Sequence, residues 1–539
     1  MTDLMSTFEP VSRTACALGV APVSAFHAWS EGEDAPAGRQ AAVDGLAALA
    51  HNLTGKSLQH VRGALDRAWA HALSLRVEEA RELGASIEPW LGDLPAAAGD
   101  EARRELQLLQ ASAFALGDHT EPSLALAEAL LRTAPDALQA PLAATLCRLA
   151  YWRRGDLGSF YALARPLPSN RLGKRQVIYT AYDQAIDAAI EAQQLRFSSA
   201  KLLAQGALDL VELQSGAGAA ALFPASLLAV LSYEEGDIDG AWDMLEARLA
   251  RLRTSGTVES AVRAYPVMGR IAARRGEAQF AAVLLREGET LGERRGWRRL
   301  IATCLYERFE LFLAESRWDE AQSAVDRLAR VASERAERTD VNWPVNRFAD
   351  LARARLGLRR APSRDDVAMI RRLHEEAVER RDLHLGLQLA VLLVDGLTAI
   401  GQDEEALGMM TRLLTVGAGV GLCQTVLDGG PRVAAVLRRV QAMARVEVQL
   451  RPVAAYVAHL VGHWPTAPAE PVSRTSGPLS ARECTVLRLI SRGHSNKRIA
   501  QALGIAVDTV KTHAKNIFGK LDAANRAEAV SRAERLGLI

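Results

Sequence analysis

Apolar residues recur at helical spacing from residue 40 to residue 460, and short polar turns interrupt them at a nearly constant interval. In a typical unit an apolar helix ends at a turn with Gly, and a second helix begins with polar residues and an Ala, as in 233–241 and 273–281. Strand patterns are almost absent from this region. The predicted turns lie near residues 117, 155, 194, 236, 276, 316, 357 and 401.

Turns spaced about 40 residues apart are typical of a tetratricopeptide-like superhelix, in which each helix pair packs on its neighbours. We therefore predict an all-α fold. The predicted organisation is an irregular amino-terminal segment 1–40, a helical-repeat sensor or interaction domain 41–463, a proline-rich linker 464–478 and a C-terminal domain 479–539.

The C-terminal domain has the pattern of four short helices. Ser480 and Glu483 have the spacing of a capping box that opens the first helix, and Gly493 ends it. Ser495 is placed to cap a second helix, and a third is predicted from Val507 to Leu521. The residues that repeat at helical period on the third helix, and are predicted to be buried, are Val510, Ala514, Ile517 and Leu521.

The opposite face of the third helix carries Lys511, Thr512 and Lys515, side chains that suit base edges and phosphates. Two helices joined by a short turn that contains Gly504, the second with a basic outer face, predict a helix-turn-helix.

These residues carry a dense resemblance to the LuxR/FixJ/NarL-type output domain over all of 479–539. Two positions depart from that family: Ala506 stands where a capping Ser is usual, and Arg498 where Glu is frequent. Neither changes the outward face of the third helix. The segments that match are 493–500, 503–505, 509–513, 516–521 and 525–530.

The resemblance implies a DNA-binding role for particular residues. The expected base contacts are Lys511, Thr512 and Lys515. The expected contacts to the DNA backbone are Ser495, Asn496, Lys497, Thr509, His513 and Lys520; for His513 a structural role is equally open. The resemblance also implies dimerisation on two half-sites through the fourth helix, predicted from Asn525 to Leu536, with contacts at Ala529, Val530 and Ala533.

The repeat region resembles the MalT-like helical-repeat sensor region of large bacterial regulators over most of 70–460. The similarity is diffuse, and 419–430 with 433–440 resembles the end of that region. In regulators of this architecture a nucleotide-binding domain usually precedes the repeats, and the residues before the first predicted repeat leave no room for one.

Charge is distributed unevenly between the two regions. The whole chain has 65 Lys and Arg residues against 64 Asp and Glu residues, a balance that indicates nothing about nucleic acid. Residues 479–539 carry four Lys and seven Arg against five acidic residues, a net charge of +6, so the rest of the chain has a net charge of −5. A solvated helical face would explain this segment without the motif; with the motif, the charge favours contact with DNA phosphates.

Composition argues against several other classes of protein. With 49% hydrophobic and 24% charged residues the chain is typical of globular proteins, and no apolar stretch approaches the roughly 20 residues that cross a bilayer. The first residues lack a signal-peptide pattern. The five Cys are far apart and form no CxxC pair, which predicts neither a zinc site nor a disulfide framework. We expect a cytoplasmic protein with no metal, no cofactor and, since no catalytic group can be assembled, no enzymatic site.

Two segments imitate parts of a nucleotide site. Residues 50–57 fit a loose phosphate-loop pattern, and the apolar run 392–395 ends in Asp395. A phosphate loop follows a buried β-strand, whereas 41–50 has a helical pattern, and Asp395 lies inside a predicted repeat helix. The nucleotide interpretation is therefore disfavoured.

Aromatic residues fall throughout the repeat region, where they could line an effector pocket or simply pack between helices. For residues at predicted helix starts, such as Trp242 and Trp318, packing is the simpler interpretation.

The sequence as a whole predicts a transcriptional regulator. We expect the repeat region to sense a small-molecule or protein effector and to control the helix-turn-helix, with double-stranded DNA, RNA polymerase and a second copy of the chain as partners and no membrane. Two alternatives stay open: a repeat scaffold that tethers a protein partner to DNA without ligand sensing, and an ATP-switched regulator built on 50–57.

Overall fold

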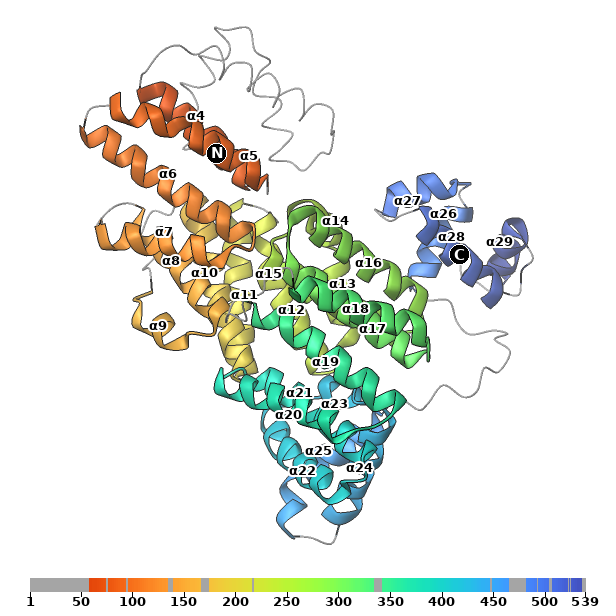
Figure 1. Cartoon of the computed structure of the whole chain (residues 1–539). Helices are drawn as coiled ribbons and strands as arrows, with labels where there is room; N and C mark the ends of the chain where they lie inside the picture. The colour runs from red at the N-terminus through yellow and green to blue at the C-terminus, as the bar shows by residue number, and fades with distance from the viewer. Residues whose placement is uncertain are drawn as a thin grey trace. The chain divides into compact units, whose positions relative to one another are not determined.

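The computed structural model describes residues 58–535 except 74–75, 94–95, 134–138, 166–173, 216–217, 334–341, 446–447, 465–480, 492, 504–506, 522 and 524. Within these residues the chain is almost entirely α-helical and contains no strand, so the predicted all-α fold is confirmed (Figure 1). The predicted segment 1–40, the phosphate-loop-like residues 50–57 and most of the predicted linker 464–478 lie outside the described residues.

The chain divides into two compact units. The first contains the described residues up to Asp187 together with Gly206–Ala221, and the second contains Ala188–Gln205 and the residues from Leu222 onward. The helices of the first unit are α4 (Leu58–Leu73), α5 (Val77–Ile87), η1 (Glu88–Asp93), α6 (Ala96–Leu116), α7 (Thr120–Thr133), α8 (Ala140–Arg154), α9 (Leu157–Ala162) and η2 (Ala219–Ala221). Two helices belong partly to each unit, α10 (Lys174–Gln193) and α11 (Phe197–Ser215).

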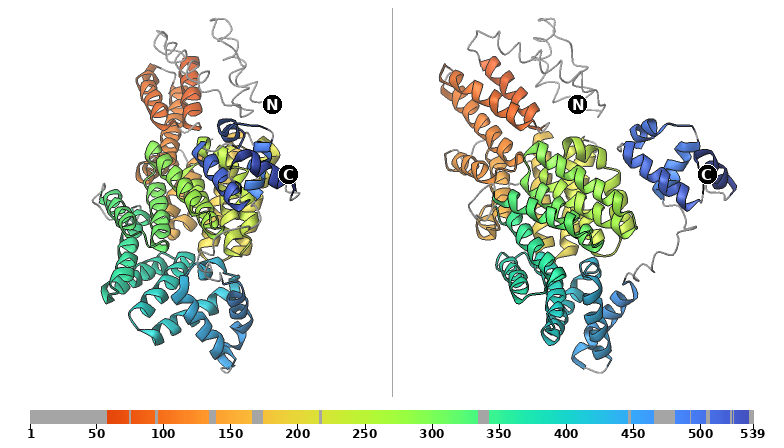
Figure 2. Two further views of the ribbon diagram at one scale, coloured as in Figure 1. Left: turned by 90° about the vertical axis from the view of Figure 1, so that its right-hand side faces the viewer. Right: turned by 45° about the vertical axis from the view of Figure 1, so that its right-hand side comes forward.

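The second unit continues the helix pairs and ends in a separate four-helix group. Figure 2 shows the pairs from α15 to α22 stacked on one another. The repeat helices are α12 (Leu222–Glu234), α13 (Ile238–Glu246), α14 (Leu249–Ser255), α15 (Val258–Arg274), α16 (Ala278–Arg295), α17 (Arg298–Ala314), α18 (Trp318–Ser333), α19 (Trp343–Arg360), α20 (Arg364–Glu379), α21 (Leu383–Ala399), α22 (Asp403–Val420), α23 (Gln424–Leu427), α24 (Gly430–Ala444), η3 (Val448–Val453) and α25 (Ala454–Gly462). The last four helices are α26 (Ala481–Ser491), α27 (Asn496–Leu503), α28 (Val507–Lys520) and α29 (Arg526–Arg535).

The turns within helix pairs use left-handed backbone at the predicted interval. Residues with positive φ occur at five predicted positions: Gly155, Gly236, Gly276, Ser316 and Gly401. Two more lie one residue after the prediction, at 118 and 195. Gly tolerates this conformation without steric cost, and it lets the N–H groups of the turn donate to the last carbonyls of the helix, as Gly155 does to Trp152.

One predicted turn is wrong. Gly357 lies inside α19, and the chain turns at 361–363 instead. Pro362 explains the displacement, because the residue before a proline is disfavoured in the helical region. Gly357 has a packing role here: a Cβ at this position would stand 2.5 Å from a carboxylate oxygen of Asp366 in the next helix.

Several helices begin with an Asp immediately after the left-handed residue. The side chains of Asp156, Asp237 and Asp382 each accept a hydrogen bond from the backbone N–H three residues later. This satisfies one of the unpaired N–H groups at the start of a helix. A left-handed residue followed by Asp therefore both ends one helix and starts the next.

Small residues allow neighbouring helices to approach closely. At Gly288 in α16, a Cβ would stand 2.7 Å from the sulfur of Cys304 and 2.8 Å from the ring of Tyr265, so no larger residue fits there without rearrangement. One apolar core joins Ala192–Ala200 and Leu231 to the buried residues of α17 to α25. The two tryptophans at helix starts differ: Trp242 is buried and Trp318 is partly exposed. In the described part of the chain, every helix is too short or too polar to cross a bilayer.

Candidate functional site

The four C-terminal helices enclose a small core of their own. The predicted buried stripe on α28 is confirmed, and it packs on residues from the other three helices. The members of this core are Val486, Leu487, Ile490, Ile499, Ala500, Val510, Ala514, Ile517, Leu521, Ala523, Ala529 and Ala533.

The ends of these helices follow from local hydrogen bonds. Gly493 has φ +78°, and its N–H donates to the carbonyl of Ile490 at 3.0 Å, which ends α26 as predicted. The hydroxyl of Ser495 accepts from the N–H of Arg498 at 3.4 Å at the start of α27. At the start of α29 the side chain of Asn525 accepts from the backbone at 3.0 Å. The predicted turn with Ala506 and the predicted cap at Ser480 lie outside the described residues.

The outer face of α28 is open and basic. Lys511 and Lys515 are exposed and lie one turn apart, with Thr512 half-buried beside them. Asn516 is exposed on the same side, and Val507 is exposed at the helix start. The three predicted base-contacting residues therefore share one surface, and the core on the opposite side fixes its orientation.

The residues predicted to contact the DNA backbone have more varied surroundings. Ser495 and Lys497 are exposed, whereas Thr509 and His513 are buried. The ammonium of Lys520 donates to the carboxylate of Glu483 at 2.7 Å, and Glu483 is only 1% exposed. The carboxylate that the sequence suggested as part of a capping box thus bonds to the far end of α28. The role of these residues at DNA stays a prediction.

Two other predicted site residues also make internal contacts. Asn496 accepts a hydrogen bond from the guanidinium of Arg526 at 3.3 Å, and the same guanidinium donates to the carbonyl of His494. Of the three residues predicted to dimerise, Ala529 and Ala533 are completely buried in the domain core. Only Val530 keeps accessible surface, so pairing through α29 would need Val530 and its exposed neighbours.

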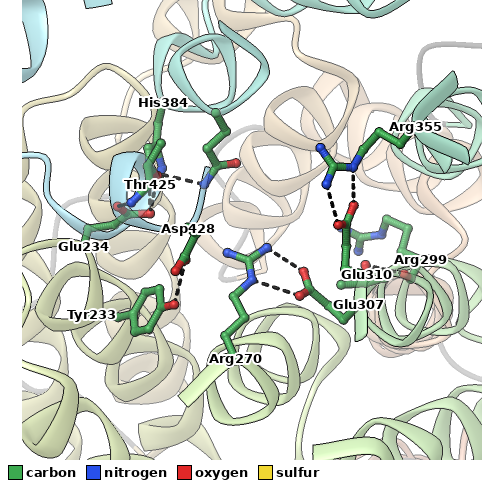
Figure 3. A network of polar contacts seen from close by, with 12 residues as sticks. Tyr233, Glu234, Arg270, Arg299, Glu307, Glu310, Arg355, His384, Thr425 and Asp428 are labelled. Carbon is green, nitrogen blue, oxygen red and sulfur yellow. Dashed lines mark hydrogen bonds and ion pairs between the residues drawn. The ribbon is translucent and has the colours of Figure 1, made fainter. Parts of the chain in front are cut away.

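A second cluster of polar residues lies inside the repeat region, where sequence reasoning found no site. Figure 3 shows it between α12, α15, α17, α19, α21 and the segment around α23. The buried carboxylate of Glu234 accepts hydrogen bonds from the ring of His384 at 3.0 Å and from the hydroxyl and N–H of Thr425 at 2.9 and 3.1 Å. Burial acts to raise the pKa of Glu234, but His384 and Thr425 outweigh it, and the pKa is lowered.

Residues next to Glu234 and Thr425 make further hydrogen bonds between the same two segments. Tyr233 donates its hydroxyl proton to Asp428 at 2.8 Å, and Arg274 reaches the other oxygen of Asp428 at 2.6 Å. The backbone N–H of Cys423 donates to the carbonyl of Glu234 at 2.8 Å. We call these bonds between 233–234 and 423–428 the α12–α23 seam.

Ion pairs link the first helices of successive pairs beyond this seam. Arg270 of α15 holds Glu307 of α17 through two bonds of 2.9 and 2.5 Å, and Arg355 of α19 holds Glu310 of α17 at 2.6 Å. Asp395, the residue that resembled a magnesium ligand, is buried in α21 and pairs with Arg432 at 3.4 Å. Within the described residues no cluster of His, Cys, Asp and Glu has the composition of a metal site.

Comparison with known proteins identifies the C-terminal domain. Residues 477–533 match the model of bacterial regulatory proteins, luxR family. This segment is a LuxR-family helix-turn-helix domain. The LuxR-family domain includes α26 to α28 and most of α29, and α28 is the second helix of its helix-turn-helix.

The curated relatives match a short part of the chain. The HTH-type transcriptional regulator MalT of Vibrio cholerae is 49% identical over 81 residues, which is 15% of this chain and 8% of that protein. MalT of Yersinia pestis (strain Pestoides F) is 46% identical over 71 residues, 13% of this chain and 8% of that protein. The match therefore spans only a small part of the relatives' length.

A solved structure resembles the repeat region. The crystal structure of a Rap protein complexed with Competence and Sporulation Factor has a TM-score of 0.50 to this chain at 13% sequence identity. The similarity covers 68% of this chain and 99% of that one. At this identity it shows a shared helical-repeat fold, which agrees with the period in the sequence.

Proposed function

We propose that the protein is a sequence-specific transcriptional regulator. In this proposal the repeat region binds a small-molecule or protein effector and thereby controls the LuxR-family domain. The regulator would act on double-stranded DNA as a homodimer, together with RNA polymerase, in the cytoplasm.

The observation that carries the DNA-binding part is the outer face of α28. Lys511 and Lys515 stand on exposed positions of a recognition helix whose other side is locked into the core by Val510 and Ile517. A rigid helix with basic side chains at its surface can enter a major groove, where Lys reads guanine and Thr contacts the thymine methyl group or base edges.

The regulatory part is supported by the polar cluster of the repeat region. A charged cluster between helices is costly to assemble, and opening it would expose groups that are now buried and bonded to one another. An effector that bonds to only the closed or only the opened arrangement would shift the equilibrium between them. The MalT relatives are transcriptional regulators, and the Rap protein with a similar fold was crystallised with a bound factor.

The DNA-binding proposal is tested by selecting bound fragments from random double-stranded DNA with the full chain. A specific regulator enriches one sequence, and the double variant Lys511→Ala, Lys515→Ala abolishes the enrichment while keeping its helical circular-dichroism spectrum. Recovery of unrelated sequences by the wild-type chain would contradict sequence-specific binding.

The two alternatives separate in a thermal-shift screen of the full chain against metabolites and ATP, because a ligand that binds the folded state raises its melting temperature. A shift with a metabolite supports effector sensing. A shift with ATP supports the nucleotide switch at 50–57, and Lys56→Ala should then abolish it. If no compound shifts the melting temperature while a partner protein is retained on DNA by the repeats, the scaffold function is favoured.

A further inference from the structure

One guanidinium beside the polar cluster differs from all those described above. Arg347 lies near the start of α19, 5.1 Å from the ring centroid of Trp343 and 4.7 Å from that of Phe348. The ring of Tyr306, from α17, lies 5.0 Å from Phe348 and extends the aromatic surface. Two aromatic rings of α19 thus face this cation, and a third ring from α17 packs on one of them.

Arg347 has no carboxylate within hydrogen-bonding or ion-pair distance among the described residues, whereas Arg355 on the same helix holds Glu310 through one hydrogen bond and a second ion-pair contact. The acidic group that acts on Arg347 from farther away is Asp382. That carboxylate is already used: it accepts from the N–H of Leu385 at 3.1 Å as a helix cap and from Gln193 at 3.3 Å.

Electrostatics around Arg347 agree with the geometry. Burial lowers the pKa of Arg347 to about 10, Asp382 and Tyr306 offset this only in part, and Arg380 lowers it further. Arg380 comes from the end of α20 and places its guanidinium 4.8 Å from the centroid of Trp343. Two positive side chains therefore gather on one indole ring, and for Arg347 the cation–π attraction replaces only part of the lost hydration.

We propose that Arg347 and Arg380, together with the rings of Trp343, Phe348 and Tyr306, form an oxyanion-binding site in the repeat region. The guanidinium of Arg347 receives the carboxylate or phosphate oxygens of an effector through its planar N–H groups, and a flat or apolar portion of the ligand packs on the rings. This site specifies the chemical class of the effector and so rests on the proposed function.

The test uses the full chain and three probes at constant ionic strength: inorganic phosphate, acetate and phenylacetate, each followed by thermal shift and by tryptophan fluorescence. We expect one class of probe to bind saturably. A preference for phosphate identifies a phosphorylated ligand, and a preference for phenylacetate identifies a carboxylate with an apolar group.

Two variants locate the response. Arg347→Gln should weaken the binding of the preferred probe by at least about tenfold, because it removes a charge-assisted bidentate contact. Arg353→Gln is the matched control: this residue lies on the same helix with 60% of its side chain exposed, 3.6 Å from Asp350, and the variant should bind the probe normally. Arg347→Lys keeps the charge without the planar fork, and it should give intermediate binding even if the Gln variant unfolds.

The proposal is overturned if no probe binds saturably, or if Arg347→Gln and wild type respond alike, since the effect would then be general salt stabilisation. DNA binding is measured separately on the same samples. Selective DNA binding without an anion response leaves the proposed regulator intact and removes this site. Anion binding at Arg347 with no DNA binding removes the proposed function and leaves the site.

Discussion

The side chain of Glu234 accepts hydrogen bonds from both the hydroxyl and the backbone N–H of Thr425, a residue 191 positions later in the chain. Stacking of neighbouring pairs alone would not join segments so distant in sequence. The bonds are made in a buried environment, where an unsatisfied carboxylate is costly. The α12–α23 seam is therefore a specific connection within the second unit.

Replacing Thr425 by Val tests the strength of this seam. The variant keeps the shape of the side chain but removes one donor from buried Glu234, so we expect a loss of about 1–3 kcal/mol in the free energy of unfolding. The matched control is Thr415→Val, whose exposed hydroxyl bonds only within its own helix, and whose effect should stay within about 0.5 kcal/mol. Urea denaturation of both variants measures the difference, and equal losses would contradict a special role for the seam.

The seam should also depend on pH through His384. Burial acts to lower the pKa of His384, but the carboxylate of Glu234 outweighs it and raises the pKa. A raised pKa in the folded state means that the stabilisation is complete below about pH 6.5 and is lost as the pH rises through the folded value. The pKa of Glu234, the partner of His384, is lowered in the folded state. The stabilisation that Glu234 contributes is therefore lost as the pH falls through its folded-state pKa.

We therefore expect His384→Gln to flatten the decline in unfolding free energy above about pH 6.5. The exposed His459 offers a control, because His459→Gln should retain the wild-type slope. If the unfolding free energy of His384→Gln declined with pH as steeply as that of the wild type, other groups would be responsible for the pH dependence.

The sequence predicted the repeat architecture because its turns are local. A Gly at a regular interval predicts the turns at Gly155 and Gly401, since few residues other than Gly adopt left-handed backbone without cost. Gly357 was misassigned because a Gly within a helix at a close contact has the same sequence signal as a Gly at a turn.

The buried polar cluster could not be predicted in this way. Glu234 and Thr425 have no sequence relationship that would indicate contact, because each is an ordinary polar residue near a turn. The exposed basic face of α28 was predictable, since Lys511 and Lys515 lie four residues apart and opposite a periodic apolar stripe. The internal pairing of Lys520 was not, because its partner Glu483 lies on another helix.

Lys515 should contribute mainly to sequence recognition. Lys515→Ala is expected to cost about 1–3 kcal/mol for binding to the selected DNA site and little for random DNA. Lys497→Ala, at an exposed position on α27, should weaken binding to the selected site and to random DNA by a similar amount. It should also reduce the number of counterions released on binding by about one. Fluorescence anisotropy at several salt concentrations distinguishes the two, and equal losses for Lys515→Ala on both DNAs would make Lys515 a phosphate contact.

Lys520 should contribute mainly to domain stability. Because Glu483 is buried and Lys520 is about a third exposed, Lys520→Ala leaves a buried carboxylate with a weaker set of partners. We expect a loss of about 1–3 kcal/mol in unfolding free energy, and the double variant Glu483→Gln, Lys520→Ala should recover part of it. A normally stable Lys520→Ala variant with weaker DNA binding would instead support the phosphate contact.

Two glycines in the second helices of their pairs should respond in opposite ways to Ala. Gly288→Ala forces a methyl group against Cys304 and Tyr265 and should cost about 1–3 kcal/mol. At Gly408 the new methyl group meets only the side-chain end of Arg412 at 3.7 Å, so Gly408→Ala should stabilise the helix by about 0.5–1 kcal/mol. Thermal denaturation of both variants gives the comparison.

Repeat proteins that contact only neighbours can fray, losing one pair after another from either end. The α12–α23 seam changes that behaviour between its two anchor points, because neither α12 nor α23 can detach without breaking bonds to the other. The helices between α12 and α23 are therefore restrained at both ends by these bonds. Breaking the seam would release both anchor points at once. A chemical change at a few side chains would then free the helices between them together rather than one pair at a time.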